Sequence, residues 1–378
     1  MRDRLFHRGP DRGLTWIHDL ERVGFAHRRL SILDLSSNAD QPMVSKDGNF
    51  RIVYNGEIYN YVEIRSELSA KGINFRTNSD TEVLLEALIE WGESAISKLN
   101  GMFAFALWDE KRKQILIARD RFGEKPLFVG RGRFGTTVIA SEMKSILTHP
   151  LIPCLADQEA LTRYGNGSWY EDSSQTFFEG IERLPAAHAA WIDLNGDIAR
   201  KWRYWIPSYT EIDYDISADT AVERFSELLQ ESIRMRLRSD VAVGSSLSGG
   251  LDSSTIVGFL SNEREKSQFS QNTFSAIFPN DPTISEHNEI KLVAEHTGVD
   301  SFTVAPDPNL FKEECRRLHY HQEEPFASAS IYLQWCVARL AREHNTTVLL
   351  DGQGADELLA GYQWYFKQYQ LDLLDHGK

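Results

Sequence analysis

Residues 241–254 read VAVGSSLSGGLDSS, and this stretch decides the fold of the second half of the chain. A short apolar run leads into Ser248, Gly249 and Gly250, and Asp252 then opens a helix with an apolar face. The two glycines let the backbone approach a ligand closely. The free N–H groups of the first helical turn, with the helix dipole behind them, attract an anion. A strand, a glycine-rich loop and a helix in this order predict a phosphate-binding loop.

A simpler interpretation makes Ser248-Gly249-Gly250 a flexible turn and Asp252 only the helix cap. The complete run from strand to helix favours phosphate binding over that interpretation. Asp252 beside a phosphate then requires a divalent cation between them, as Mg²⁺ is usually held. The loop is not a Walker motif, because no Gly-Lys-Ser/Thr follows.

A second glycine-rich loop follows the apolar run 347–350 and reads DGQGADE over residues 351–357. In a parallel sheet both loops would lie at the carboxyl ends of strands, where ligands collect. Asp356 would then share the cation with Asp252. Taken alone, this segment is equally compatible with a turn that carries solvated acids.

The second half alternates short apolar runs with helical periodicity. Strands are expected at 273–278 and 347–350, and helices at 221–238, 285–297 and 329–344. Strand and helix in alternation predict an α/β domain with a doubly wound parallel sheet.

The first half has a different pattern, with short apolar runs broken by Gly, Asn and Asp. Residues 50–54, 114–118 and 137–140 are typical of strands. Helices are expected at 61–71 and after Ser79, where a cap precedes apolar residues at helical spacing. This half is therefore expected to be an α+β domain, and the aromatic, aperiodic stretch 202–219 is expected to be the linker. The predicted domains span residues 1–205 and 206–378.

Composition excludes several classes of protein. The 378 residues carry a formal charge of −14, which argues against nonspecific nucleic-acid binding. No stretch approaches the roughly 20 apolar residues that span a bilayer, and the first residues lack the apolar core of a secretory signal. Cys154, Cys315 and Cys336 follow no CxxC spacing. The chain is expected to be cytoplasmic and to act on small molecules without nucleic acid or membrane, and a homodimer stays open as its assembly.

The run Ser248–Ser254 resembles the PP-loop of ATP pyrophosphatases, which split ATP to AMP and pyrophosphate while adenylating a carbonyl oxygen. The resemblance implies ATP as substrate, with Mg²⁺ held by Asp252 and Asp356. The residues implied in ATP binding are Leu247, Ser248, Gly249, Gly250, Asp252, Ser253, Ser254, Ala276, Asp351 and Gly352.

Seven segments of the first half, in order along the chain, resemble class II glutamine amidotransferases of the N-terminal-nucleophile type. They are HRGPD (7–11), AHRRLSILD (26–34), NGEIYN (55–60), NSDTE (78–82), GMFAFA (101–106), RDRFG with KPL (119–127) and ASEMK (140–144). Joined to a PP-loop domain, this half is similar to the glutamine-hydrolysing asparagine synthetase family. The resemblance implies a glutaminase sandwich followed by the doubly wound domain.

The same resemblance implies a glutamine pocket. Arg29 would hold the α-carboxylate, since a guanidinium fork suits that group. Asp80 and Glu57 would balance the α-ammonium. Asn55 and the Gly56 N–H would form the oxyanion hole. The pocket would be lined by the backbone of Leu30, Ser31, Ile32 and Leu33. Singly, Arg29 and Asp80 are more often ion-pair or capping residues, and their joint occurrence favours the pocket.

The chain departs from the family at two catalytic positions. The family nucleophile is a cysteine at position 2, activated by its own α-amino group, and position 2 here is Arg2. Both ends look clipped beside the family, which favours a fragmentary gene model over a natural ammonia-dependent form. Many relatives carry glutamate where this chain has Gln353, and an amide cannot serve as a base.

The expected reaction is ATP-dependent adenylation of the aspartate side chain and its amidation by ammonia from glutamine. The products would be asparagine, AMP and pyrophosphate. Two alternatives stay open. One is an amidotransferase on another carboxylate, such as a sugar-linked or peptide acceptor, or a cyclising β-lactam synthetase type. The other is an inactive nucleotide-binding fragment.

Overall fold

The chain folds into two compact units, seen in a computed structural model that describes residues 1–167, 174–208, 213, 215–267, 271–281, 283–326 and 328–375. Unit 1 comprises Met1–Ile216 and Gln322–Pro325, and unit 2 comprises Ser217–His321 and Phe326–Lys378. Among the described residues, no helix combines the length and apolarity needed to cross a membrane.

Unit 1 is built on antiparallel strands. Its largest sheet has the order β11 (Ile198–Arg203), β10 (His188–Ile192), β6 (Gln114–Arg119), β5 (Gly101–Asp109), β4 (Phe50–Ile58) and β3 (Met43–Val44). Two smaller sheets are the hairpin β1 (Arg12–Ile17) and β2 (Gly24–Arg29), and the set β8 (Thr137–Ala140), β7 (Phe128–Arg131) and β9 (Ile181–Arg183). Strand pairing throughout these sheets is antiparallel.

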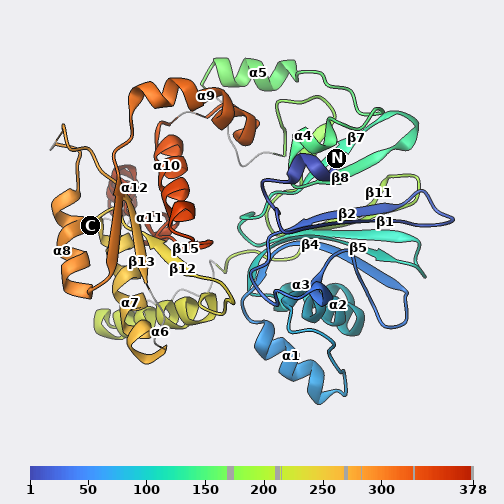
Figure 1. The fold of residues 1–378 in the computed structure, drawn as a ribbon, viewed down its shortest axis with the longest axis horizontal. Coiled ribbons are helices and arrows are strands. Elements are labelled where there is room, and N and C mark those ends of the chain that lie inside the picture. Colours follow the sequence, from blue (N-terminus) through green and yellow to red (C-terminus); the bar gives the residue numbers. More distant parts are fainter. Residues whose placement is uncertain are drawn as a thin grey trace. The chain divides into compact units, whose positions relative to one another are not determined.

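The two faces of the large sheet of unit 1 belong to different hydrophobic cores, and these cores define the layers. Helices α1 (Tyr61–Ala70), α2 (Asp80–Trp91) and α3 (Ala95–Lys98) cover one face, as Figure 1 shows. The opposite face packs against β2 and β7, and α4 (Met143–Ile146) covers the far side of β7. A short helix, α5 (Gln158–Gly165), follows. The α+β sandwich expected for this half is observed as these layers.

Local signals predicted α2 and β4 at the right places in the chain, but the predicted β4 was too short. The Ser79 side chain accepts a hydrogen bond from the Thr81 N–H at 3.1 Å, which makes it the expected N-cap of α2. Strand β4 continues beyond the predicted 50–54 to Ile58, because it pairs with β5 along its whole length. The polar residues from Asn55 to Glu57 are therefore part of a strand, where the sequence alone showed only a motif.

Unit 2 is built on one parallel sheet with the order β14 (Asp300–Val304), β13 (Asn272–Ala276), β12 (Val243–Ser246) and β15 (Val348–Leu350). Its helices are α6 (Ala218–Arg236), α7 (Leu251–Ser267), α8 (His287–Thr297), α9 (Pro308–Gln322), α10 (Ser330–Glu343), α11 (Ala355–Leu359) and α12 (Gln363–Asp375).

Helices cover both faces of this sheet, as a doubly wound domain requires. One core joins Leu247 to Val257 of α7 and Ile290 of α8, and another joins Leu318 of α9 to Cys336 of α10. Figure 1 shows α8 and α10 on opposite sides of the strands. Strand β14 and helix α9 were not predicted, because both are short of apolar residues.

The linker predicted over residues 202–219 is too long at both ends. Trp202 and Arg203 belong to β11, where they pair with Ala189 and His188, and the last two predicted linker residues begin α6. Residues 209–212 and 214 lie outside the described chain. An edge strand whose side chains face solvent lacks the apolar alternation that would have identified it.

The strand order creates a switch point next to β12. From β12 the chain moves outward to β13 and β14, and it then returns to β15 on the other side of β12. Ligands of open α/β sheets bind outside the carboxyl ends of the strands at such a point. The loops that leave β12 and β15 are therefore the expected ligand-binding edge of unit 2.

Candidate functional site

The first part of the site is the exposed edge of β4 in unit 1. Gly56 lies opposite Phe103 of β5, but both backbone groups of Phe103 bond to Asp120, at 3.1 Å from its N–H and 2.8 Å to its C=O. Gly56 and Phe103 are therefore a non-hydrogen-bonded pair, and the Gly56 N–H faces away from β5.

Only glycine fits at position 56. A Cβ atom there would lie 2.2 Å from the carbonyl oxygen of Met102 and 2.7 Å from the Cα of Phe103. Strand β3 begins at Met43, opposite Ile52, and so does not extend alongside Gly56. The N–H of Gly56 thus points to an edge without a neighbouring strand.

Side chains take the place of the missing strand on either side of Gly56. The Tyr54 N–H donates to Gln41 Oε1 at 2.6 Å, and the Ile58 N–H donates to Asp80 Oδ2 at 3.0 Å. The side-chain nitrogen of Asn55 is buried and has no hydrogen-bond partner among the described residues. Asn55 Nδ2 and the Gly56 N–H are adjacent donors of the kind that forms an oxyanion hole.

Asp80 is a buried carboxylate below this edge, at the first position of α2. Its Oδ2 also accepts a hydrogen bond from the Tyr54 hydroxyl at 2.8 Å. Burial raises the pKa of Asp80 above its ordinary value, although these hydrogen bonds act in the opposite direction. A ligand cation beside it would compensate the buried charge.

Arg29 at the end of β2 is buried and bonds to its own loop. Nη1 donates to Ser36 O at 2.8 Å and to Asp40 Oδ1 at 3.0 Å, and Nη2 donates to the carbonyls of Leu33 and Asp34. Of its five N–H groups, only that on Nε lacks an acceptor among the described residues. In this structure the guanidinium shapes the loop that follows it, with no open fork for a carboxylate.

The motif segments of the first half are joined by direct hydrogen bonds. Asp11 accepts from the Ser31 N–H at 2.8 Å, and Asp34 accepts from the Asn78 N–H at 2.8 Å. A Cβ atom on Gly9 would lie 2.2 Å from the carbonyl carbon of Arg28, so the two segments cross in contact. The structure therefore connects the Arg29 loop to Asp80 and, through Tyr54, to Asn55.

The other predicted pocket residues vary in exposure. Glu57 is buried, Ser31, Ile32 and Leu33 are half-buried, and Leu30 is exposed.

His27 is a residue of this site that sequence reasoning missed. Its Nε2 lies 3.1 Å from Tyr54 O and donates to it, because a carbonyl oxygen can only accept. Burial lowers the His27 pKa to about 4. His27 lies two residues before Arg29 on β2, so both side chains are on the same face of the strand. That alternation was the signal available in the sequence.

The second part of the site is the phosphate loop of unit 2, residues 247–254. The Ser248 Oγ accepts from the Gly250 N–H at 3.2 Å, and the Ser253 Oγ accepts from the Ser248 N–H at 3.2 Å. Gly249 has φ +90°, and a Cβ there would lie 2.9 Å from Glu289 Cβ. The loop is thus a tight turn that needs glycine at this position.

The two glycine-rich loops of unit 2 meet. A Cβ on Gly352 would lie 3.1 Å from the Ser253 N and 3.2 Å from Asp252 Cβ. The Ser254 Oγ is buried and has no partner among the described residues. Ala276 ends β13, the neighbour of β12. Backbone N–H groups and hydroxyls at a helix N-terminus suit a phosphate group.

The acids predicted to bind metal belong to these two loops. Asp252 and Asp356 are half-buried, whereas Asp351 and Gln353 are exposed. Within the described residues, no three His, Cys, Asp or Glu side chains form a metal-binding group. Two carboxylates completed by phosphate oxygens and water are a usual donor set for Mg²⁺ beside a nucleotide, so the residues present fit such an ion.

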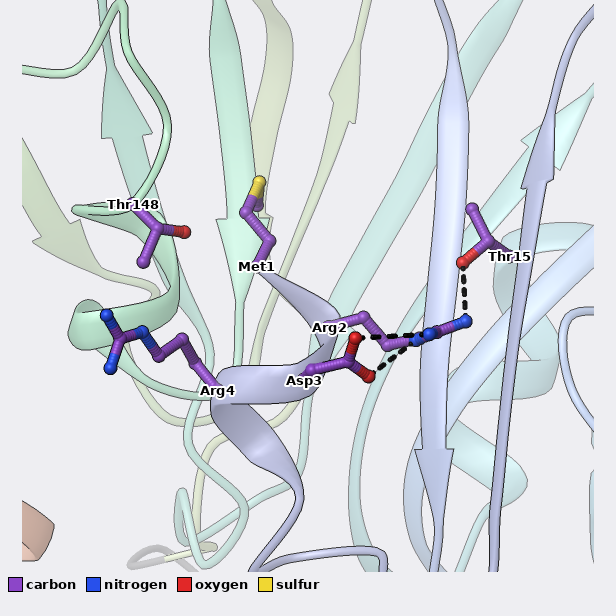
Figure 2. A pocket seen from close by; sticks show the side chains of 6 residues that line it. All are labelled: Met1, Arg2, Asp3, Arg4, Thr15 and Thr148. Atoms are coloured by element: carbon purple, nitrogen blue, oxygen red, sulfur yellow. Dashed lines mark hydrogen bonds and ion pairs between the residues drawn. The ribbon is translucent and has the colours of Figure 1, made fainter.

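A surface hollow of about 730 Å³ lies at the start of the chain in unit 1, lined by residues 1–4, Thr15 and Thr148. Figure 2 shows the Arg2 side chain reaching Thr15, with both Asp3 oxygens turned toward its guanidinium. Arg2 is therefore occupied by surface partners.

Comparison with known proteins also divides the chain into two parts. The family described as glutamine amidotransferase domain matches residues 1–205, and the family described as asparagine synthase matches residues 224–376. Asparagine synthetase [glutamine-hydrolyzing] 1 of Bacillus subtilis is 36% identical over 376 residues, which are 98% of this chain and 56% of that protein.

Two further relatives show the spread of the similarity. The putative asparagine synthetase [glutamine-hydrolyzing] 2 of Methanocaldococcus jannaschii is 31% identical over 397 residues, 99% of this chain and 74% of that protein. Amidase chry2 of Gibberella zeae is 32% identical over 387 residues, 99% of this chain and 56% of that protein. The chain spans little more than half the length of most of these relatives.

Proposed function

Because this chain belongs to the asparagine synthetase family, we propose that it is an ATP-dependent ligase that converts a carboxylate to an amide. The observation that carries the proposal is the pair of loops at the switch point of unit 2, where Gly352 packs on Asp252 and Ser253. We assign amide transfer to residues 1–205 and amide synthesis to residues 206–378.

In the proposed reaction, a carboxylate oxygen of the acceptor attacks the α-phosphorus of ATP, and pyrophosphate leaves. Ammonia then adds to the acyl carbon, AMP leaves, and one proton is released. The N–H groups of Gly249 and Gly250 and the hydroxyls of Ser253 and Ser254 would hold the phosphates. Mg²⁺, held by Asp252 and Asp356, would offset the charge of the triphosphate.

Unit 1 is proposed to bind glutamine at the edge of β4. The amide oxygen of glutamine would accept from Asn55 Nδ2 and the Gly56 N–H, and the ammonium would lie toward Asp80 and Glu57. Arg29 would act through the loop 30–33 that it shapes, with only Nε open to the ligand carboxylate. Hydrolysis also needs a nucleophile, and we assign that role to none of these pocket residues.

Aspartate is the proposed acceptor, on the basis of the relatives' printed activity. One relative that matches nearly the whole chain is named amidase chry2 and not asparagine synthetase. Other acceptor carboxylates therefore stay in the test. Gln353 is exposed and uncharged, so it would contact the acceptor by hydrogen bonds and not as a base. We place the reaction in the cytoplasm, on small molecules.

The test is pyrophosphate release by the purified chain with MgATP and aspartate. We expect release with ammonium chloride and none without an acceptor carboxylate. Glutamate in place of aspartate controls for acceptor choice, and a panel of sugar-linked and peptide carboxylates tests other acceptors. A folded chain that shows no magnesium-dependent ATP binding by calorimetry would refute the ligase assignment.

A further inference from the structure

The sheet of unit 2 carries a row of hydroxyl side chains on one face. Ser245 of β12 is in register with Thr273 of β13, and Thr273 is in register with Ser301 of β14. Neighbours in register share a face of the sheet, and so does Ser275, two residues beyond Thr273. Four hydroxyl-bearing residues therefore lie together on one face.

This face is the one that α7 and α8 cover. Leu247 and Ile277 have the same alternation as the hydroxyl residues, and both belong to the core that contains Val257 of α7. The opposite face carries Phe274 and Phe302, whose rings stack 5.7 Å apart. The hydroxyl row is thus enclosed between the sheet and α7.

None of these four hydroxyl oxygens has a hydrogen-bond partner in the described part of the chain. Ser245 and Thr273 are 0% exposed, and Ser275 is 1% exposed. Strands buried on both faces of a parallel sheet usually carry apolar side chains there. Buried polar atoms usually have a partner, so a group of them without one requires an explanation.

Two more partnerless atoms border the same space. Gln271 precedes Thr273 by two residues on the same face, and its Nε2 donates to Val257 O of α7 at 3.2 Å while its Oε1 has no partner. Ser254, one helical turn before Val257, has a buried Oγ without a partner. The six oxygens together form what we call the hydroxyl layer: Ser245, Ser254, Gln271, Thr273, Ser275 and Ser301.

We infer that the hydroxyl layer binds a group of ordered water molecules between α7 and the sheet. The oxygens do not reach one another, but a bridging water bonds two or three such groups and is a regular part of protein interiors. The donors and acceptors are neutral hydroxyls and one amide oxygen, which match water and provide no charge for a metal ion. The waters extend from Gln271 at the amino end of the sheet to Ser254 in the phosphate loop.

The inference concerns the fold of unit 2 and holds whether or not the chain is a ligase. The first turns of α7 would rest partly on bound water. The apolar contacts of α7 include Val257, which shares a core with Leu247 and Ile290.

The experiment measures whether the removal of one hydroxyl raises or lowers the melting temperature, Tm. Thr273→Val keeps the shape of the side chain and removes its hydroxyl. If water is bound, the variant loses a hydrogen bond, and we expect Tm to fall by about 2–4 °C. If the layer is dry, the variant removes a buried unpaired group, and Tm rises. An unchanged or raised Tm would overturn the inference.

Two further measurements complete the test. Ser261→Ala is the matched control on α7, because its hydroxyl donates directly to Thr297 O at 3.1 Å and its loss lowers Tm without involving water. A crystal structure of the unaltered chain at about 1.5 Å should show water within hydrogen-bond distance of Ser245, Thr273 and Ser275. Absence of density there would overturn the inference even if Thr273→Val failed to fold.

Discussion

The two parts of the site are built in opposite ways. In unit 1 the motif side chains bond to one another: four N–H groups of Arg29 have partners, and Asp80 accepts from Tyr54 and Ile58. In unit 2 the motif bonds only within its own turn, Gly249 must be glycine, and the Ser254 hydroxyl has no partner among the residues that the structure describes.

The difference shows how each site would recognise its ligand. The β4 edge is a hydrogen-bonded scaffold in which Asn55 Nδ2 has no partner among the described residues, so its ligand must match a fixed shape. The phosphate loop offers oriented N–H groups, so its ligand must bring negative charge. This arrangement lets a chain with a net charge of −14 bind an anion locally.

The largest expected effect is on the scaffold of unit 1. Asp120 is fully buried and accepts from the N–H groups of Phe103, Phe122, Glu124 and Lys125. Asp120→Ala leaves these donors unpaired, and we expect the free energy of unfolding to fall by about 4 kcal/mol. Urea denaturation measures it.

The control for that variant lies in unit 2. Asp281 is exposed and accepts from the Thr283 N–H, so Asp281→Ala should leave the free energy of unfolding almost unchanged. Equal losses of unfolding free energy in the two variants would contradict the difference that we expect between the buried Asp120 and the exposed Asp281.

The next effect is on the phosphate loop. Gly249→Ala places a Cβ 2.9 Å from Glu289 Cβ at φ +90°, and we expect the Kd for MgATP to rise at least ~10-fold. The control is Gly258→Ala on α7, where a Cβ meets nothing within 4 Å. That variant should keep its affinity and gain about 1 kcal/mol of stability. Titration calorimetry separates them, and an unaltered Kd in Gly249→Ala would contradict the loop's role.

A smaller effect depends on pH and concerns His27. Its pKa is lowered from 6.5 to about 4 in the folded chain, so the unfolded chain binds a proton first as pH falls. Stability is unaffected above pH 6.5 and is lost progressively between pH 6.5 and 4, by about 3 kcal/mol.

The matched variant for this pH effect is His27→Gln, which keeps an N–H donor for Tyr54 O but does not titrate. Its unfolding free energy, measured at pH 7 and pH 5, should fall less with acid than that of the unaltered chain. Identical slopes would show that His27 is not the group responsible.

The smallest effect concerns Asn55 at the β4 edge. Asn55→Ala removes a buried amide nitrogen that has no partner in the described chain, so stability should not fall. The Kd for glutamine should rise about 3–10-fold, the worth of one hydrogen bond.

Asn60→Ala is the control for Asn55→Ala, because the Asn60 side chain has two hydrogen-bond partners. Asn60 accepts from the Asn100 N–H at 2.9 Å and donates to Lys98 O at 3.0 Å. Its loss should lower stability by about 1 kcal/mol and leave glutamine affinity unchanged. A stability loss in Asn55→Ala would mean that its amide has a structural role.

Much of the architecture was predictable because its signals are local. The cap at Ser79 and the run from β12 through the glycines to α7 depend on residues a few positions apart. The meeting of Gly352 with Asp252 followed from two strand-to-loop transitions in one parallel sheet. Strand β11 and helix α9 were missed, since neither has a continuous apolar face.

The sequence by itself determined which motifs the chain carries: a glycine-rich loop of the PP-loop type and a set of glutamine amidotransferase-type segments. Only the tertiary structure decided how those groups are used. The partners of Arg29, the direction of the Gly56 N–H and the contact of His27 with Tyr54 depend on strand register and on loops distant in sequence. A shift in strand register leaves the local propensity of each residue unchanged but redirects every N–H along the strand. The register was therefore selected by long-range packing.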